Sequence, residues 1–311
     1  MKSVPEKTTL NAPTKGQATK IAQSIRAVLK PEDIEKVLAD LGIDKDATQR
    51  VIGSMSELQS DITDVLATSL KRLSVNNQFV VEEVESNFGY LSGYKPKEIV
   101  EQVHKLSELF PGIGYVNKDL LAQIEKGEVV LPTGAEGWFA IPHWSKIGSS
   151  YQEALEKVLA LLENTFYDGY FENYRQGQLG ECWLHETSDK EGEMKTLQQS
   201  QNADILLVPA QFGLRHRGRS ADRACAVMNT GEFSLGAYEI VIMLLTHPER
   251  LQKLNDLWID CAGDRYSLGI FFCSVVLNFW CDHQGLHFDC RPCDDPDSNF
   301  GSVSGFMPSL K

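Results

Sequence analysis

The chain has 311 residues, of which 42% are hydrophobic and 23% are charged, a balance typical of globular proteins large enough to bury a sizeable core. Its formal net charge of −13 at pH 7 argues against general polyanion binding, because phosphate affinity comes mainly from lysine and arginine. No window approaches roughly eighteen uninterrupted apolar residues, and the first sixteen residues lack the apolar core of a signal peptide. We therefore expect a cytoplasmic protein with no membrane partner, for which nucleic acid is an unfavourable ligand.

The beginning of the chain predicts a mobile arm followed by helices. Residues 1–16 are polar and contain two prolines and a glycine, so they bury too little apolar surface to offset their ordering entropy. Residues 17–75 have helical periodicity, and residues 46–73 place apolar side chains at steps of three and four, which gives one apolar stripe. That stripe either packs within its own domain or mediates contact with another helix. We predict a helical interaction region over residues 17–75, with a possible homo-oligomer formed through residues 46–73.

Residues 76–311 predict a domain that mixes helices and strands. After helices over 96–109 and 118–126, the patterns from Gly137 onward give the order strand, helix, strand, strand, helix, strand, which permits a split βαβ or ferredoxin-like arrangement. Further helices are expected over 221–228 and 234–246, then a short strand in LWID and two strands over 270–281 and 286–291 joined at Gln284-Gly285. The expected class is α+β, with a helical N-terminal region followed by a mixed α/β domain with a C-terminal β-hairpin.

The C-terminal run CDHQGLHFDCRPC concentrates side chains that bind zinc. Cys290 and Cys293 have the CxxC spacing common in zinc sites, although no second such pair accompanies them. In a hairpin, His287 and Asp289 would share one face while Cys290 lies on the other, so the ligands do not converge automatically. A metal site and ordinary strand residues with half-buried thiols both stay open. The possible metal ligands are Cys281, His283, His287, Cys290 and Cys293.

An arginine cluster lies in the run FGLRHRGRSADRA, after a predicted buried strand and before a predicted helix. Because a helix start carries partial positive charge, gathered arginines repel one another there unless a negative group compensates. Internal or intersubunit salt bridges are one source of that charge. The other is an anionic small molecule or an acidic protein surface, because guanidinium groups grip phosphate and carboxylate in a bidentate way. The predicted ligand-binding residues are Arg215, His216, Arg217, Arg219 and Arg223.

Two carboxylates have positions that permit acid or base chemistry. Glu239 lies in the apolar run LGAYEIVIMLL and needs a partner when buried, for which we expect an arginine of the cluster. Asp260 lies in WIDCAGD at a predicted strand end, where a catalytic role and a turn-capping role explain it equally well. The chain contains no GxSxG, GxGxxG or P-loop pattern, so the sequence does not decide whether the protein is an enzyme.

Four stretches, LPTGAEGWFAIPHW, ILLVPAQFGLRHRGRS, GAYEIVIMLLTHPERL and LWIDCAGD, resemble a group of uncharacterised bacterial proteins with no established activity. The resemblance covers residues of about 90–311, implies a bacterial protein that is not secreted, and transfers no catalytic residue. Together these observations predict a cytoplasmic binding protein that recognises an anionic ligand or acidic partner through the arginine cluster. The alternative is a zinc-dependent hydrolase-type enzyme that uses the C-terminal Cys/His cluster, with Asp260 or Glu239 as acid or base; zinc is the one cofactor considered.

Overall fold

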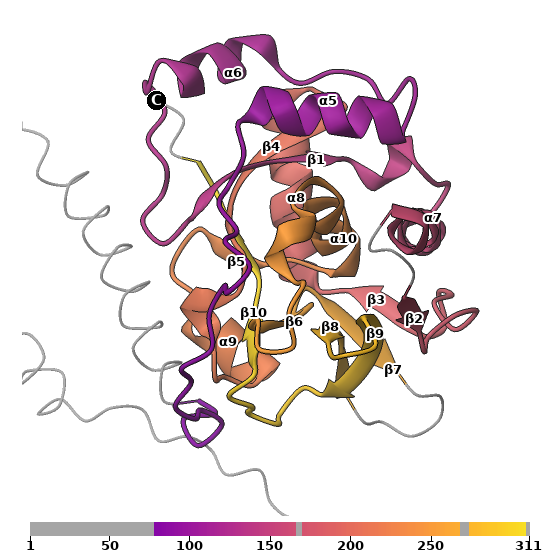
Figure 1. Ribbon diagram of the computed structural model, residues 1–311. Helices are drawn as coiled ribbons and strands as arrows, with labels where there is room; N and C mark the ends of the chain where they lie inside the picture. Colours follow the sequence, from indigo (N-terminus) through magenta and orange to yellow (C-terminus); the bar gives the residue numbers. More distant parts are fainter. Residues whose placement is uncertain (1–77, 166–169, 268–273, 309–311) are drawn as a thin grey trace, which may run out of the picture. The chain divides into compact units, whose positions relative to one another are not determined.

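The computed structural model describes residues 78–165, 170–267 and 274–308, all of which belong to one compact unit. Within these ranges the chain forms six α-helices and eleven strands in mixed sheets, which confirms the α+β class (Figure 1). The predicted arm at 1–16 and the helical region at 17–75, including the stripe at 46–73, lie outside the described residues. Among the helices that are described, none has the length and apolar character needed to cross a membrane.

The first sheet has four strands in the order β1-β4-β11-β5, and every neighbouring pair is antiparallel. The strands are β1 (Gly137–Pro142), β4 (Ile205–Gln211), β5 (Glu232–Ser234) and β11 (Ser304–Phe306). β4 is buried along its whole length because strands pair with both of its edges and helices cover it. A run such as ILLVPA is typical of a strand buried on both faces.

The second sheet has seven strands and contains the C-terminal hairpin. Its strands are β2 (Phe171–Asn173), β3 (Leu184–Glu186), β6 (Trp258–Asp260), β7 (Asp264–Ser267), β8 (Ser274–Cys281), β9 (Leu286–Pro292) and β10 (Phe300–Ser302). β6 and β7 pair with the two halves of one edge of β8, while β9 pairs along the other edge. β10 and β2 then extend the sheet beyond β6 and β9. The predicted hairpin is thereby confirmed.

The helices lie close to where the periodicity predicts them. They are α5 (Ile99–Leu109), α6 (Lys118–Glu125), α7 (Tyr151–Thr165), α8 (Ser188–Gln201), α9 (Ala221–Val227) and α10 (Ala237–Thr246). α10 is buried at every position and packs against α7, α5 and β1.

Two differences from the predicted arrangement concern the sheets. The predicted helix over 234–246 begins only at Ala237, because Glu232–Ser234 pairs with β11 as strand β5. The predicted order of strands also does not give a ferredoxin-like sheet. β1 and β4 belong to the first sheet while β2 and β3 belong to the second, so the helices between them connect two different sheets.

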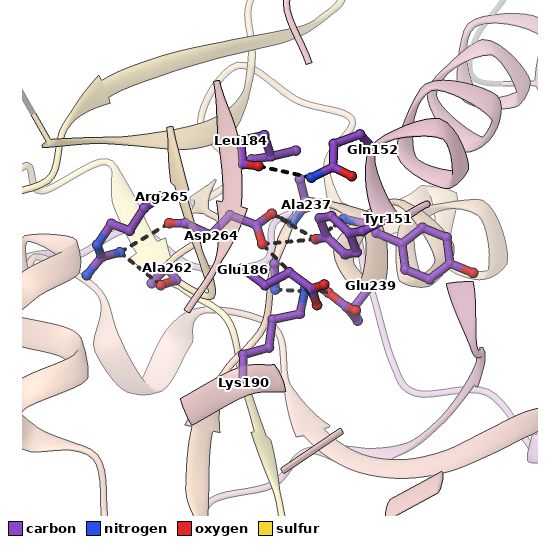
Figure 2. Close-up of polar contacts among 12 residues, drawn as sticks. Tyr151, Gln152, Leu184, Glu186, Lys190, Ala237, Glu239, Ala262, Asp264 and Arg265 are labelled. Carbon is purple, nitrogen blue, oxygen red and sulfur yellow. Dashed lines mark hydrogen bonds and ion pairs between the residues drawn. The ribbon is translucent and has the colours of Figure 1, made fainter. Parts of the chain in front are cut away.

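A lysine with no exposed surface lies among three carboxylates (Figure 2). The Nζ of Lys190, on α8, lies 2.8 Å from Glu239 Oε2, 3.1 Å from Glu186 Oε1 and 3.3 Å from Asp264 Oδ1. The ring of Tyr151, at the start of α7, lies 3.8 Å from the same ammonium. The three carboxylates come from α10 and from β3 and β7 of the second sheet, so one cation ties that sheet to α8 and α10. We call these five residues the Lys190 network.

Asp264 also caps helix α10. Its carboxylate accepts hydrogen bonds from the Tyr151 hydroxyl, at 2.8 and 3.0 Å, and from the Ala237 N–H at 2.7 Å. A carboxylate at a helix N-terminus is stabilised by the helix dipole. The adjacent Gly236 leaves no room for a side chain, because a Cβ there would lie 2.3 Å from Asp264 Oδ1 and 2.6 Å from Lys190 Nζ. The glycine is therefore required by the close approach of the network.

The prediction that an arginine pairs with Glu239 is wrong, because its partner is Lys190. Glu239 also accepts a hydrogen bond from the Gly236 N–H at 3.1 Å. Burial raises the pKa of Glu239 to about 7, and the nearby carboxylates of Asp264 and Glu186 add to this rise against the opposing effect of Lys190. The need for a buried partner was visible in the sequence, but the polar run that holds Lys190 gave no sign of burial.

We expect Lys190→Met to destabilise the protein by about 3–5 kcal/mol, because it leaves carboxylates buried without their cation. Urea unfolding at neutral pH measures the change in free energy. Lys195→Met is the matched control, since Lys195 is exposed on the same helix and should change the stability by less than about 0.5 kcal/mol. Equal effects of the two substitutions would show that the network does not stabilise the fold.

We expect the stability of Glu239→Gln, relative to that of the wild type, to increase as the pH rises. Because the folded-state pKa of about 7 exceeds the ordinary value of 4.5, the stability linked to Glu239 is present below about pH 4.5 and is lost as the pH rises through 7. Glutamine does not titrate and keeps an oxygen for the Gly236 N–H. The Tm of the variant minus that of the wild type should increase from about pH 5 to about pH 8. A difference that stays constant or decreases would contradict the raised pKa.

Candidate functional site

One face of the second sheet carries a row of ring side chains that crosses four strands. Phe300 on β10 is paired with Trp258 on β6, and His287 on β9 is paired with Trp280 on β8. The ring centroids of Trp258 lie 5.1 Å from Phe300 and 5.8 Å from Trp280, and the stacked rings of Trp280 and His287 are 3.9 Å apart. Neighbouring strands are about 4.8 Å apart, so cross-strand rings on one face are in contact. We call these four residues the aromatic row.

A second row of polar side chains runs beside the first. Side chains two positions apart on a strand share a face, so the residues two positions from each ring lie on the same side of the sheet. Their pairing across the strands is continuous, from β10 through β6 and β8 to β9. This polar row consists of Ser302, Asp260, Asn278 and Asp289.

The two rows border a shallow cavity of about 320 Å³ that is largely open to solvent. This volume falls at the lower end of the range for small-molecule sites, roughly 300–1,000 Å³. The lining consists of Trp258, Trp280 and Phe300 from the aromatic row, Asn278 and Asp289 from the polar row, and the neighbouring Cys290 and Arg291. Ligand sites usually combine such apolar rings with a few polar groups.

The charged groups around the cavity are already paired with one another. Arg291 Nη1 donates to Asp260 Oδ2 at 3.0 Å, and its guanidinium lies 4.3 Å from the ring of Phe300. Asp289 Oδ1 lies 3.0 Å from Arg175 Nε. Burial raises the pKa of Asp260 to about 6 although Arg291 opposes the rise. The positive and negative charges of these two pairs therefore balance one another.

Several polar atoms at this site are buried without a hydrogen-bond partner among the described residues. They are Trp258 Nε1, Asn278 Oδ1, Asp260 Oδ1 and Ser302 Oγ. An unpaired buried polar group costs about 1–3 kcal/mol, and folded proteins contain few of them. Trp258 and Asn278 also line the cavity, so one unpaired donor and one unpaired acceptor belong to residues of its wall, although both atoms are themselves almost entirely buried.

The structure does not bring the five predicted metal ligands together. Across residues 78–165, 170–267 and 274–308, no group of three or more His, Cys, Asp or Glu side chains is arranged to hold a metal ion. Cys281 and Cys290 pack on the core side of the hairpin, whereas His287 lies in the aromatic row on the opposite face, as strand alternation predicted. The Sγ of Cys293 lies 3.4 Å from Asp222 Oδ2.

Burial also disfavours the thiolate form of the cysteines in the hairpin. Burial raises the pKa of Cys281 to about 11 and raises the pKa of Cys290 as well. A metal ligand must be a thiolate, so a raised pKa opposes binding. His287 instead lies 2.9 Å from Asp282 through its Nε2. The predicted zinc site has no support from this geometry, and His283 belongs to the turn of the hairpin.

The arginine cluster has counter-charge within the protein. Arg215 Nε and His216 Nε2 lie 2.9 and 2.8 Å from Glu232 Oε1. Burial alone would raise the pKa of Glu232, but hydrogen bonds from His216, the Asn229 N–H and Arg215 lower it to about 2. Glu232 is therefore an ionised partner at neutral pH.

The remaining arginines of the cluster contact the segment before residue 90. Arg219 and Arg223 both lie 2.9 Å from the carboxylate of Glu83. Arg217 donates to the Phe88 carbonyl at 2.9 Å. The contacts with Glu83, like those with Glu232, are the internal salt bridges that the sequence left open as one alternative. Anion binding by the cluster stays a prediction. The internal partners remove the uncompensated positive charge on which that prediction was based.

The sequence patterns pointed to Cys290 of the cavity lining and to the nearby Asp260 and His287. They did not point to the other lining residues, which are Trp258, Trp280, Phe300, Asn278, Asp289 and Arg291. A signal was present: four short segments, WID, NFW, HFD and FGS, each place a ring and a polar side chain two positions apart. Alternation puts each such pair on one face of its strand. The local sequence does not determine the register that aligns the four segments.

Searches for similar proteins found no relative of this chain. No protein-family model, no curated protein and no solved structure matched the sequence or the fold. The resemblance to uncharacterised bacterial proteins therefore stays a prediction, and the function must be argued from the geometry of the site.

We expect Arg215→Ala to destabilise the protein by about 1–2 kcal/mol, because Glu232 has no exposed side-chain surface and loses a charged partner. Arg217→Ala is the control in the same cluster. Arg217 is exposed and contacts a backbone carbonyl, so its loss should change the stability by less than about 0.5 kcal/mol. Denaturant unfolding distinguishes the two. The reverse order would show that the described pairing does not carry the stability of the cluster.

Proposed function

We propose that the protein binds a small, neutral, ring-shaped polar ligand in the cavity on the second sheet. The observation that carries this proposal is that Trp258 and Asn278, each with an unpaired polar atom, line a wall that also contains the rings of Trp280 and Phe300. The flat face of a ring can lie against Trp258, Trp280 or Phe300, whose faces attract C–H groups. The polar edge of the same ring can accept from the indole N–H and donate to the amide oxygen once these two side chains turn toward it, because both atoms are buried in this structure.

The pairing of charges favours a neutral ligand. Arg291 already binds Asp260, and Asp289 already lies against Arg175. An anion would have to draw Arg291 away from a buried carboxylate, and leaving such a carboxylate unpaired is costly. A cation would compete with Arg175 for Asp289 in the same way. A ligand with hydroxyl or amide groups requires neither exchange.

A binding role fits the position of Asp260 better than a catalytic role. A carboxyl with a pKa of about 6 can act as a general acid near neutral pH. Asp260, however, has no exposed surface, does not line the cavity and is held by Arg291. A general acid must come within hydrogen-bond reach of the group that it protonates. We therefore assign Asp260 the role of holding Arg291 in the cavity wall.

Isothermal titration calorimetry with D-glucose, N-acetylglucosamine, adenosine and uridine tests the proposal, with inorganic phosphate as the charged comparison. We expect binding of at least one neutral probe and none of phosphate. Trp258→Phe keeps the ring but deletes the N–H, so affinity for that probe should fall about three- to tenfold, the value of one neutral hydrogen bond. Trp144→Phe is the control, because Trp144 lies outside the cavity.

Thermal unfolding of both variants shows whether the fold is retained. Equal losses of affinity in Trp258→Phe and Trp144→Phe would exclude the cavity as the site. Binding of phosphate in preference to all four neutral probes, or binding of none of the neutral probes at millimolar concentration, would contradict the proposed ligand class.

A further inference from the structure

The aromatic row continues beyond the cavity to the edge of the sheet. Tyr174, directly after β2, stacks on His287 with ring centroids 5.9 Å apart and an interplanar angle of 16°. His287 therefore lies between Trp280 on the β8 side and Tyr174 on the β2 side, and it is 1% exposed. Tyr170 lies edge-on to the same histidine, with centroids 5.9 Å apart. Both tyrosines are exposed, at 42% for Tyr170 and 41% for Tyr174.

A single carboxylate holds both tyrosines in place. Glu172 Oε2 accepts hydrogen bonds from the hydroxyls of Tyr170 at 2.8 Å and Tyr174 at 2.9 Å. Glu172 is paired with His287 across the parallel strands β2 and β9, and its Oε2 lies 3.8 Å from His287 Nδ1. His287 Nδ1 is a further buried polar atom without a hydrogen-bond partner among the described residues. The tyrosines thus form a platform that is ordered before any ligand arrives, which lowers the entropic cost of binding.

The tyrosine platform is joined to the cavity. Arg175, the residue after Tyr174, lies against Asp289, which is part of the cavity lining. β2 is separated from β8 by two strand spacings, roughly 10 Å, so the platform and the cavity are about two sugar rings apart on one face.

We infer that the ligand is a neutral linear oligosaccharide, with one sugar ring in the cavity and another on the Tyr170–Tyr174 platform. This inference rests on the proposed function and specifies its ligand class. Sugar rings have a C–H face that packs against aromatic rings and hydroxyls that both donate and accept, which suits Trp258 Nε1 and Asn278 Oδ1. A β-1,4-linked chain keeps successive sugar rings extended in one direction, as two aromatic subsites on neighbouring strands require.

Single-stranded nucleic acid also stacks on aromatic rows, but the charges disfavour it. Such binding needs a basic groove that follows the phosphates. The arginines nearest to the two subsites, Arg175 and Arg291, are held by Asp289 and Asp260. Glu172 adds negative charge at the platform itself, because the tyrosine hydrogen bonds lower its pKa. A neutral chain meets no such repulsion.

Calorimetry with D-glucose, cellotetraose, chitotetraose and a single-stranded oligothymidylate tests this inference on the full chain. We expect one of the two tetrasaccharides to bind at least about tenfold more tightly than glucose. Tyr174→Ala should weaken tetrasaccharide binding about five- to tenfold, the value of one lost aromatic contact, and so reduce its advantage over glucose. Tyr115→Ala is the control, because Tyr115 is 57% exposed and belongs to neither subsite.

The outcomes separate the inference from the proposed function. Equal affinities for glucose and both tetrasaccharides, with binding still sensitive to Trp258→Phe, would overturn the second subsite and leave the cavity as the site. Binding of adenosine or uridine but of no sugar would overturn the carbohydrate assignment alone. Tighter binding of the oligothymidylate than of either tetrasaccharide, weakened by Tyr174→Ala, would assign the row to nucleic acid instead. Failure of every neutral probe would overturn the proposed function as well.

Discussion

The buried ammonium of Lys190 and its three carboxylates form the contact on which the rest of the structure depends. The carboxylates come from β3, β7 and α10, so no single element can shift without leaving a buried charge unpaired. Asp264 at the start of β7 also caps α10 through the Ala237 N–H. One side chain therefore fixes the second sheet against the central helix.

The candidate site is built on the segment that this contact holds. β6, which carries Trp258 and Asp260, is followed after a short turn by β7 and Asp264. Both strands pair with the same edge of β8, and the register of β6 on β8 aligns Asp260 with Asn278 in the polar row. The unpaired atoms of the polar row cost stability. Proteins commonly keep such costs at functional sites, where a rigid scaffold compensates for them.

The sequence predicted those parts of the fold that local periodicity determines. The helix at Tyr151–Thr165 and the hairpin of β8 and β9 agree closely with their patterns. β5, β7, β10 and β11 were missed because each has three or four residues and is stabilised by pairing with distant strands. The candidate site was missed for the same reason. Each of its segments has a recognisable pattern, but the register that aligns the segments depends on the whole sheet.

For the charged residues, the local sequence likewise indicated that a partner is needed but did not identify that partner. The sequence indicated that the arginine cluster needs negative partners and that Glu239 needs a positive one. In the structure, Glu232 and Glu83 pair with the arginines. Lys190 pairs with Glu239. Burial of Lys190 could not be predicted, because its helix is polar in sequence and becomes buried only by packing against β4 and β5.

The indole N–H signal of Trp258 in ¹H–¹⁵N spectra, assigned by its loss in Trp258→Phe, tests the central claim most directly. This N–H has no partner among the described residues, so a ligand in the cavity should supply one. Titration with D-glucose and with cellotetraose should move this signal downfield and saturate it with the affinity found by calorimetry. If the Trp258 signal stays in place while that of Trp144 or another indole moves, the ligand binds elsewhere and the assignment of the cavity is wrong.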